Sequence, residues 1–458
     1  MLARSGVLSL AFSLLAGHVV GLDLDIDSQA QRKMLRDITD SIKSVAKTIA
    51  SGIVSLYDAT LKDDLIPGLF QDPYYWWESG LAFNALIDYS GLTNDSEYNA
   101  RISEALQHQL GDFDAFMPSN QTKTLGNDDQ STWGLASLSA YETGLSAPAS
   151  GSWLQFAKNV FDTQIGRWDT KSCDGGLKWQ IFSFNNGYNY KNAISSGQLF
   201  LLAARLADHT GNATYTEWAN KVYNWTTEVG LVSDDYRVYD GTDDTTNCSS
   251  VNHIQWSNNH AMYTEGVALM YKLSNSSQVW IDTVKGFVNA SSVFTDDNGA
   301  LREVACENRG RCDVDQRSFK GTAARSFGRA AQAAPIVADS IYKTLNASAR
   351  AAASSCAVNT NKDVACSFEW DLGTAEDSGA ASNGLGELLN ALQSVQALLW
   401  RTANFTGSTS NSTARPNATI SGSPSGASGV PQSTGAGSTL AASVTFVLAI
   451  AFAAALSC

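Results

Sequence analysis

Hydrophobic positions in the central part of the chain recur with the spacing of α-helices, and the alternation typical of strands is almost absent. Glycine, proline, asparagine and aspartate separate the helical patterns from one another. The pattern predicts twelve helices, which run near residues 37–59, 76–91, 97–111, 128–143, 152–166, 190–209, 214–230, 257–273, 277–293, 319–333, 335–354 and 382–402.

The twelve segments alternate in character. Odd-numbered segments such as 152–166 (SWLQFAKNVFDTQI) are amphipathic and have one polar face. Even-numbered segments such as 190–209 (which contains SSGQLFLLAARLA) are rich in small residues and apolar nearly all round, so we expect them to be buried on both sides. Six outer and six inner helices make an (α/α)6 barrel, and this all-α architecture is the predicted fold.

The even-numbered segments recur with a period of roughly 60 residues and begin in a similar way. If the six inner helices are parallel, their starts meet at one end of the barrel and form a polar, aromatic cleft suited to a ligand. A helical array with ordinary caps is the alternative, but it does not explain the aromatic residues at these starts. The residues concerned are Trp76, Trp77, Asp128, Asp129, Tyr190, Lys191, Asn192, Asn258, Asn259, Phe319, Lys320 and Asn383.

The first 21 residues have the layout of a secretory signal peptide. Arg4 precedes an apolar run over residues 7–15, and the small residues Val19 and Gly21 suit a signal peptidase. The run is too short for a membrane span and polar sequence follows it, so we predict a signal peptide at 1–21 rather than a buried first helix.

The other end of the chain carries a second targeting pattern. Residues 404–427 form a stalk rich in Ser, Thr and Gly, and residues 440–456 are apolar and uncharged. Small residues at Ser425, Gly426 and Ala427 precede the apolar tail by the distance typical of a glycosylphosphatidylinositol (GPI) attachment site. We therefore predict that 428–458 are removed, which leaves 22–403 as the barrel domain. A membrane-spanning helix would normally be followed by Lys or Arg, and only Ser457 and Cys458 follow the tail.

Removal of the tail would leave six of the seven cysteines, an even number that fits three disulfides in a secreted protein. Close spacing favours Cys306–Cys312 and Cys356–Cys366, which leaves Cys173–Cys248, although six cysteines allow other pairings. The net charge of −14 argues against a nucleic-acid partner. Glycosylation sequons, which must lie on the surface where they are used, occur at Asn94, Asn120, Asn212, Asn224, Asn247, Asn275, Asn289, Asn346, Asn404, Asn411 and Asn417.

The stretch LGNDDQSTWG (125–134) places Asp128 beside Asp129 at the start of a predicted helix. One interpretation is structural: Asn127 caps the helix with Gln130 three residues later, and the helix dipole favours each acid by about 0.3–1 kcal/mol. The other is catalytic, because adjacent first-turn carboxyl groups can lie roughly 5 Å apart, as retaining glycosidases require. The helix N-terminus would keep one carboxylate ionised, and its charge would raise the pKa of the other.

Aromatic residues that can stack on sugar rings gather near the helix starts. A stripe of aromatics is more often core than ligand site, but several of these stand beside glycines and amides in the segment 174–192 (DGGLKWQIFSFNNGYNYKN). They are Tyr74, Tyr75, Trp76, Trp77, Trp133, Trp179, Tyr188, Tyr190 and Trp256.

Other chemistries fit the sequence less well. A helical terpene cyclase needs a third aspartate where this chain has Thr132. The acidic loop 234–244 lacks the final glutamate of an EF-hand, and the five histidines do not have the spacing of zinc ligands. There is no G-x-S-x-G motif and no phosphate-binding loop. We therefore expect neither a metal nor a cofactor.

The motifs GNDDQSTWG, GGLKWQIF, NGYNYKNAISSGQLFLLAARLADHTGN, VYDGT…C and FKG resemble those of glycoside hydrolase family 76, in particular its GPI-anchored fungal cell-wall branch. The resemblance covers about residues 23–400. It implies an (α/α)6 barrel that acts on an α-1,6-linked mannoside, with Asp128 as nucleophile and Asp129 as acid/base. The chain departs from the family pattern in Trp256-Ser-Asn-Asn-His-Ala261, where Asn258 replaces a tyrosine and Ala261 a glycine.

The expected function is that of a retaining, endo-acting α-1,6-mannosidase or transglycosidase. The resemblance implies action on mannan or on the mannose-containing GPI glycan in fungal cell-wall biogenesis, with β-glucan as a possible acceptor that becomes cross-linked to GPI proteins. We expect a secreted monomer, GPI-anchored to the cell membrane and present in the wall. The alternative is a catalytically idle mannan-binding or structural wall protein, and the presence of both aspartates argues against it. The residues expected to bind substrate are Trp76, Trp77, Asn127, Trp133, Tyr188, Tyr190, Lys191, Asn192, Asp240, Trp256, Asn259 and Lys320.

Overall fold

The computed structural model describes residues 20–21, 32–60, 66–371 and 384–405. Within these ranges the chain forms twelve α-helices, close to the twelve segments that the hydrophobic pattern predicts. They are α1 (Arg32–Thr60), α2 (Trp76–Thr93), α3 (Asn99–His108), α4 (Asn127–Glu142), α5 (Trp153–Ile165), α6 (Ala193–Thr210), α7 (Ala213–Glu228), α8 (Ser257–Leu273), α9 (Gln278–Ala290), α10 (Phe319–Ala333), α11 (Ala338–Ser354) and α12 (Leu385–Gln396).

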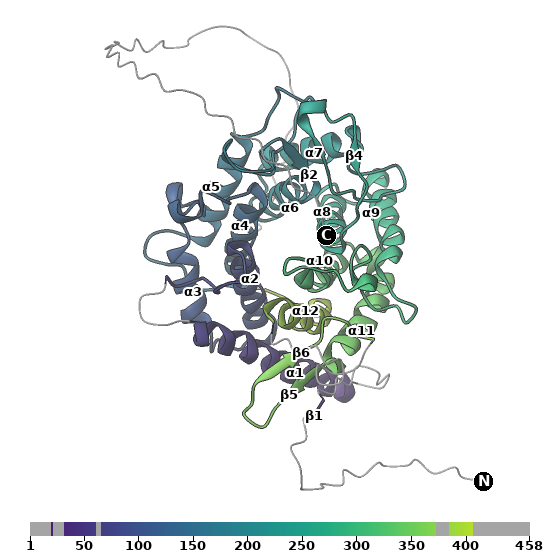
Figure 1. The fold of residues 1–458 in the computed structure, drawn as a ribbon. Helices are drawn as coiled ribbons and strands as arrows, with labels where there is room; N and C mark the ends of the chain where they lie inside the picture. Colours follow the sequence, from purple (N-terminus) through teal and green to yellow (C-terminus); the bar gives the residue numbers. More distant parts are fainter. Residues whose placement is uncertain (1–19, 22–31, 61–65, 372–383, 406–458) are drawn as a thin grey trace, which may run out of the picture. The chain divides into compact units, whose positions relative to one another are not determined.

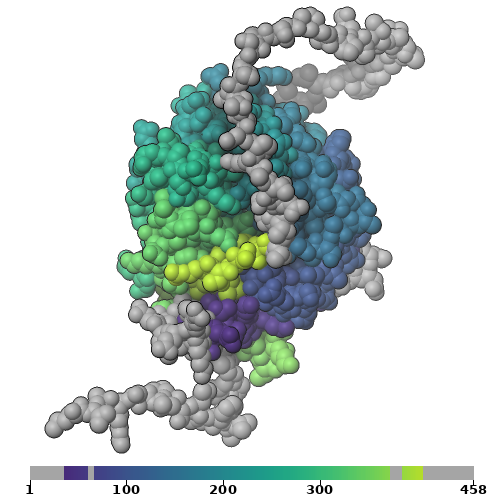
Figure 2. Space-filling model, turned by 180° about the vertical axis from the view of Figure 1, so that it is seen from behind, coloured from purple at the N-terminus to yellow at the C-terminus, as the bar shows by residue number. Residues whose placement is uncertain are grey.

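The even-numbered helices form an inner ring and the odd-numbered helices lie outside it (Figure 1). Each inner helix packs against the next, and α12 contacts α2 to close the ring. Figure 2 shows the surface from behind, where purple residues of the N-terminal part lie next to the yellow C-terminal end of the described chain, in keeping with the contact between α1 and α12. The (α/α)6 barrel predicted from the sequence is therefore confirmed.

Burial explains why the inner segments lack a polar face. In α8, every residue from Ser257 to Met270 is buried, whereas α9 buries only four of its residues, all on one side. An inner helix contacts inner neighbours on both flanks and an outer helix behind it, so small residues such as Gly197 are needed for close approach. A Cβ atom added to Gly197 would lie 2.5 Å from the Tyr263 ring of α8.

Short strands that the hydrophobic pattern does not predict lie at the ends of the barrel. The antiparallel sheet β2 (Tyr190–Asn192), β3 (Gly241–Asp243) and β4 (Val251–Asn252) precedes α6 and α8. The helix predicted from residue 190 therefore begins three residues later, at Ala193, where the Asn192 side chain accepts a hydrogen bond from Ser195 N and caps it. A second sheet pairs β1 (Val20–Gly21) with β5 (Cys356–Val358) and β6 (Val364–Cys366).

The three predicted disulfides are present as Cys173–Cys248, Cys306–Cys312 and Cys356–Cys366. The first joins residues that are 75 positions apart in the sequence, whereas the other two close short loops.

Most of the glycosylation sequons lie on the surface, as their use would require. Asn346 is half-buried, and Asn411 and Asn417 fall outside the described residues. The exposed asparagines are Asn94, Asn120, Asn212, Asn224, Asn247, Asn275, Asn289 and Asn404.

None of the helices in the described part of the chain is long and apolar enough to cross a membrane. The predicted GPI site at Ser425, Gly426 and Ala427, the apolar tail and nearly all of the signal peptide lie outside the described residues, so those assignments stay predictions.

Candidate active site

A cavity of about 860 Å³ opens where the inner helices begin. Five of the six inner helices contribute residues from their first turns or from the residue just before them, as parallel inner helices predict. The start of α12 does not line the cavity, and Asn383 lies outside the described residues. Aromatic rings, amides and carboxylates share the walls, among them Tyr74, Trp76, Trp77, Asp128, Asp129, Trp179, Asn192, Asp240, Trp256, Asn259, Asp315 and Phe319.

Asp128 and Asp129 occupy the second and third positions of α4, where both side chains are half-buried and line the cavity. The N-cap is Gly126, so the prediction that Asn127 caps this helix is wrong by one residue. The Gly126 N–H donates to Asp129 Oδ2 at 2.7 Å, and the Asp129 N–H donates to Asp128 Oδ1 at 3.1 Å. Asp129 therefore takes the position that the acidic residue of a capping box occupies.

Gly126 is required by the close approach of both carboxyl groups. A Cβ atom at this position would lie 2.2 Å from Asp128 Oδ1 and 3.2 Å from Asp129 Oδ2. Because both oxygens lie so close to one point, Asp128 Oδ1 and Asp129 Oδ2 cannot be more than about 5.5 Å apart, an upper limit that is compatible with the separation in retaining glycosidases. Any side chain at position 126 would displace at least one of the two carboxyl groups.

Burial and a neighbouring negative charge raise the pKa of each carboxyl group. Burial raises the pKa of Asp128 well above its usual range, and the charge of Asp129 adds to the shift. Burial also raises the pKa of Asp129, to about 7, with the charge of Asp315 adding to the shift and the hydrogen bond from Gly126 opposing it. The sequence predicted one raised and one ordinary pKa. Instead both are raised, because desolvation at the cavity floor outweighs the effect of the helix N-terminus.

The segment 178–181 connects the start of α4 to β2. Asn127 N–H donates to the Trp179 carbonyl at 2.8 Å, and the Asn127 side-chain amide donates to the Lys178 carbonyl at 2.8 Å. Trp179 N–H in turn donates to the Tyr190 carbonyl at 2.6 Å. Asn127 does not line the cavity, so its role is to hold this segment against the catalytic turn.

Trp179 contacts the carboxyl pair directly. Its side chain hydrogen-bonds to Asp128, which lowers the pKa of that carboxyl and opposes the effect of burial. The indole lies against Gly187, whose φ of 86° few other residues adopt, and a Cβ there would come within 2.3 Å of the ring. The sequence pattern marks Trp179 only as one aromatic among several.

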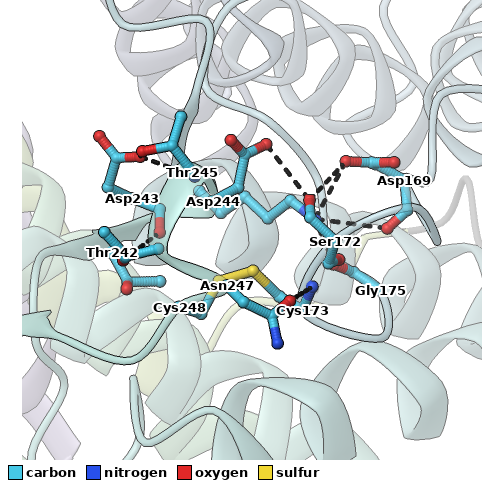
Figure 3. The surroundings of a disulfide bond; sticks show 12 residues. Asp169, Ser172, Cys173, Gly175, Thr242, Asp243, Asp244, Thr245, Asn247 and Cys248 are labelled. Atoms are coloured by element: carbon cyan, nitrogen blue, oxygen red, sulfur yellow. Dashed lines mark hydrogen bonds and ion pairs between the residues drawn. A yellow bond between two sulfur atoms is a disulfide. The ribbon is translucent and has the colours of Figure 1, made fainter.

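A buried ionic cluster and a disulfide support the segment from behind (Figure 3). Lys191 is fully buried, and its ammonium group donates to the carbonyls of Ser172 and Gly175 and pairs with Asp169 at 3.2 Å. Lys178 forms an ion pair with Asp244, which lies close to the Cys173–Cys248 disulfide. Lys191 therefore supports the loop instead of contacting a ligand, contrary to the prediction.

Asp240 links two of the predicted aromatic residues. Its carboxylate accepts from the Tyr190 hydroxyl at 2.6 Å, from Trp256 Nε1 at 2.8 Å and from the Asn252 amide at 3.1 Å. Asp240 and Trp256 line the cavity, whereas Tyr190 stands behind them and Tyr188 packs under the Lys178 ammonium group. The two tyrosines orient the wall and do not form it.

Two further predicted ligand contacts are buried away from the cavity. Trp133 is fully buried and stacks on Trp76, with ring centroids 5.3 Å apart. Lys320 is fully buried, donates to the Phe368 carbonyl at 2.6 Å and lies 4.0 Å from the Trp370 ring centroid. Both residues stabilise the wall from behind.

Of the predicted substrate contacts, Trp76, Trp77, Asn192, Asp240, Trp256 and Asn259 line the cavity together with the carboxyl pair. Sequence reasoning missed Asp315, Gln180, Asn185 and Asn186, which also line it. Asp315 accepts a hydrogen bond from Trp77 Nε1 at 3.2 Å, and burial raises its pKa. An isolated aspartate in a loop carries no pattern that would identify it. The amides do lie in the 174–192 segment that the sequence marks as unusual.

An adjacent carboxyl pair in an aromatic-lined cavity of an (α/α)6 barrel is the arrangement expected of a glycoside hydrolase. The profile of Glycosyl hydrolase family 76 matches residues 41–410, and the chain belongs to this family.

Curated relatives agree with this assignment. The chain is 40% identical over 392 residues to mannan endo-1,6-alpha-mannosidase DCW1 of Saccharomyces cerevisiae, which covers 85% of this chain and 83% of that protein. It is 38% identical over 393 residues to mannan endo-1,6-alpha-mannosidase DFG5 of Candida albicans, and this match covers 84% of this chain and 83% of that protein.

Solved structures agree as well. Dfg5 from Chaetomium thermophilum in complex with glucosamine superposes with a TM-score of 0.76 at 35% identity, over 83% of this chain and 93% of that one. An inactive variant of an α-1,6-mannanase of Salegentibacter sp. in complex with α-1,6-mannotriose gives a TM-score of 0.61 at 19% identity, over 78% and 99%. At that identity, the second likeness concerns the fold alone.

Proposed function

We propose that this protein is a retaining, endo-acting α-1,6-mannosidase or transglycosidase of the fungal cell wall, with mannan or the mannose-containing GPI glycan as its substrate. The observation that carries the proposal is the close approach of Asp128 and Asp129 over Gly126 at the floor of the cavity. An inverting enzyme would need roughly 6.5–9.5 Å between its carboxyl groups to admit a water molecule. The names of the relatives support an α-1,6-mannoside as the substrate class.

In the first step, a carboxylate oxygen of Asp128 attacks the anomeric carbon of a mannose unit and forms a covalent bond to it. The bond from that carbon to the leaving oxygen breaks, and Asp129 donates its proton to that oxygen. In the second step, Asp129 removes a proton from water or from a sugar hydroxyl. The oxygen so activated attacks the anomeric carbon, and Asp128 leaves as a carboxylate.

The raised pKa values suit these roles. Because two adjacent carboxylates repel each other in a desolvated site, the pair keeps one proton near neutral pH. Asp128 accepts hydrogen bonds from the Asp129 N–H and from Trp179, and both stabilise its charged form. Burial raises the pKa of Asp128 in spite of these donors, so the shared proton belongs to the pair as a whole, and the choice of Asp128 as nucleophile rests on the family resemblance and on the two donors that favour its charged form.

The division of roles has its own test, which uses an α-mannoside donor with an activated leaving group. Such a donor needs no acid in the first step. Asp129→Ala should therefore still form the covalent intermediate, detectable by mass on Asp128, whereas Asp128→Ala should form none. The reverse result would exchange the two roles.

Transfer to a sugar acceptor should compete with hydrolysis. Trp76, Trp77 and Trp256 line the cavity and can hold an acceptor ring, and a bound acceptor gains several kcal/mol over dilute competitors through positioning. Secretion and a GPI anchor, proposed from the terminal sequences, and a wall location, proposed from the family resemblance, would surround the enzyme with polysaccharide.

The experiment supplies a labelled α-1,6-mannoside donor with and without β-glucan or mannan oligosaccharides. Label should appear in an enlarged product whose amount rises with acceptor concentration. Label found only in free sugar at every acceptor concentration would identify a plain hydrolase. No turnover of any donor would favour the idle, mannan-binding alternative.

A further inference from the structure

The exposed glycosylation sequons are not spread evenly over the barrel. Four of them follow the C-terminal ends of inner helices, which lie at the end of the barrel opposite the cavity. They are Asn94 after α2, Asn212 after α6, Asn275 after α8 and Asn404 beyond α12. Asn120 differs from these four, because residues on its C-terminal side form part of the cavity wall.

The turn that carries Asn120 borders the cavity. It begins as a 3-10 helix at Ser119–Gln121, and the Thr124 N–H donates to the Gln121 carbonyl at 3.0 Å, which continues the same tight winding. Gln121 and Lys123 both line the cavity. Side chains three residues apart lie on one side of such a turn, so Asn120 projects to the side on which Lys123 meets the cavity.

The Asn120 amide is accessible, and the turn beneath it is fixed. Asn120 is exposed, and its side chain has no hydrogen-bond partner in the described part of the chain. Two bonds hold the turn: the Thr122 hydroxyl donates to the Ser119 carbonyl at 3.2 Å, and the Asn185 amide donates to the Thr122 carbonyl at 3.1 Å. A glycan attached to Asn120 would therefore start from a defined point beside the cavity.

We propose that an N-linked glycan on Asn120 stands at the mouth of the cavity and restricts the entry of long glycan chains. An N-linked glycan is bulky and stays in solvent, so it occupies space beside the wall to which it is attached. An endo-acting enzyme must admit a chain that continues beyond the cavity, and such a chain has to pass this space. The length restriction rests on the endo-acting function proposed above, whereas the attachment of the glycan does not.

Short substrates should escape the restriction. The cavity of about 860 Å³ falls in the range that encloses a drug-sized ligand, so an oligosaccharide of a few units ends close to the mouth. Asn120 does not line the cavity, and the glycan leaves the carboxyl pair untouched. Its effect is therefore on the length of the chain that enters and not on the chemistry.

The sequon of Asn94 provides a matched control. The 18 residues of α2 separate Asn94 from the cavity end of the barrel, which is about 27 Å along the helix. Ser96 completes this sequon and is exposed, so Ser96→Ala removes the attachment signal and leaves Asn94 in place. Loss of a glycan so far from the mouth should not change the entry of a chain.

The test uses protein secreted from a eukaryotic host that expresses the full chain, and mass mapping of its glycopeptides reports whether Asn120 is occupied. Asn120→Gln and Thr122→Ala each remove the sequon. In both, kcat/KM for long α-1,6-mannan should rise roughly threefold to tenfold because entry is faster, and kcat/KM for a short α-1,6-mannooligosaccharide should stay unchanged. Native endoglycosidase treatment of the wild type should give the same rise. Thr122→Ser, which keeps the sequon, and Ser96→Ala should match the untreated wild type.

An unoccupied Asn120 would overturn the proposal, and so would equal kcat/KM values for long mannan in the wild type and both variants. A rise that also appears for the short oligosaccharide, or in Ser96→Ala, would contradict a restriction by length at the mouth. If no donor is turned over, the proposed function fails, but the affinities of the same variants for long and short mannooligosaccharides still decide whether the glycan restricts entry.

Discussion

The two ends of α4 carry acids in opposite electrostatic surroundings. At its start, Asp128 and Asp129 line an open cavity, and burial raises both pKa values. At its end, Glu142 is buried too, but Arg205 binds it through two hydrogen bonds of 3.0 and 2.7 Å. Arg329, at 2.7 Å, and His209 complete its surroundings. The two guanidinium groups, helped by the hydrogen bond to His209, outweigh burial and hold the pKa of Glu142 well below its usual range.

The comparison shows that burial alone does not distinguish a catalytic acid from a structural one. The cations of the barrel that face Glu142 come from α6 and α10, and they neutralise it. The pair at the other end is left with hydrogen-bond donors, and its neighbour Asp315 adds negative charge. The free energy of ionisation is therefore kept low at the structural end and high at the catalytic end, where a proton must be held and released.

Loss of the carboxylate at the structural end should have the largest effect on stability. Glu142→Gln removes the ion-pair partner of buried Arg205 and one of the two carboxylates that pair with Arg329, which keeps Glu265, and we expect about 3–5 kcal/mol less stability at neutral pH. Because the folded pKa of Glu142 is lowered, the deficit should be complete above the unfolded pKa and shrink as the pH falls through the folded value. Denaturant unfolding at several pH values measures it.

The control for this variant is Asp208→Asn, which removes a partly exposed ion pair with Lys272. It should cost less than about 1 kcal/mol. Turnover per folded molecule should be unchanged in Glu142→Gln. A fall in turnover without a fall in stability would mean that the structural end takes part in the reaction.

At the catalytic end, removal of a charge should increase stability. The pKa of Asp129 is about 7 in the folded protein against 3.8 for the free group, so ionisation destabilises the fold as the pH rises from about 4 to about 7. Asp129→Asn should gain about 1–2 kcal/mol at pH 8 and nothing at pH 4. If the variant is less stable at both pH values, Asp129 is only a helix cap.

The smallest effect is expected for the hydrogen bond from Trp179 to Asp128, worth about 0.5–1.5 kcal/mol. Its removal in Trp179→Phe should raise the pKa of Asp128, and the acidic limb of kcat/KM should move to higher pH because the nucleophile must be ionised. Trp256→Phe, which breaks a hydrogen bond to Asp240 instead, should change KM and leave the limb in place. Equal pH profiles for wild type and Trp179→Phe would contradict this role.

The barrel was predictable because long helices repeat the same burial pattern over many turns, as in α8. The small sheet was not, since three residues such as Tyr190–Asn192 are too few to show alternation. Because side chains alternate between the two faces of a strand, Lys191 points away from the face that Tyr190 and Asn192 share, and it is buried. Nearness in sequence to a site does not give direction, so Trp133, one turn below Asp129, lies beneath Trp76.

The carboxyl pair was predictable because its motif combines two adjacent acids with a preceding glycine and a following tryptophan. Its electrostatics were not, since both pKa values depend on burial, and that of Asp129 also on Asp315, which is distant in sequence. The position of Asn185 and Asn186 in the cavity wall was not predictable either, because it depends on how the loop that carries them folds.

The most direct test of the central claim is the turnover of Asp128→Asn and Asp129→Asn on an α-1,6-mannoside donor, with unfolding curves measured in parallel. The catalytic interpretation predicts that each variant loses roughly a thousandfold or more in kcat while remaining folded. An ordinary acidic helix start predicts a small loss of stability and unchanged turnover. Wild-type turnover in both folded variants would contradict the assignment of Asp128 and Asp129 as the catalytic pair.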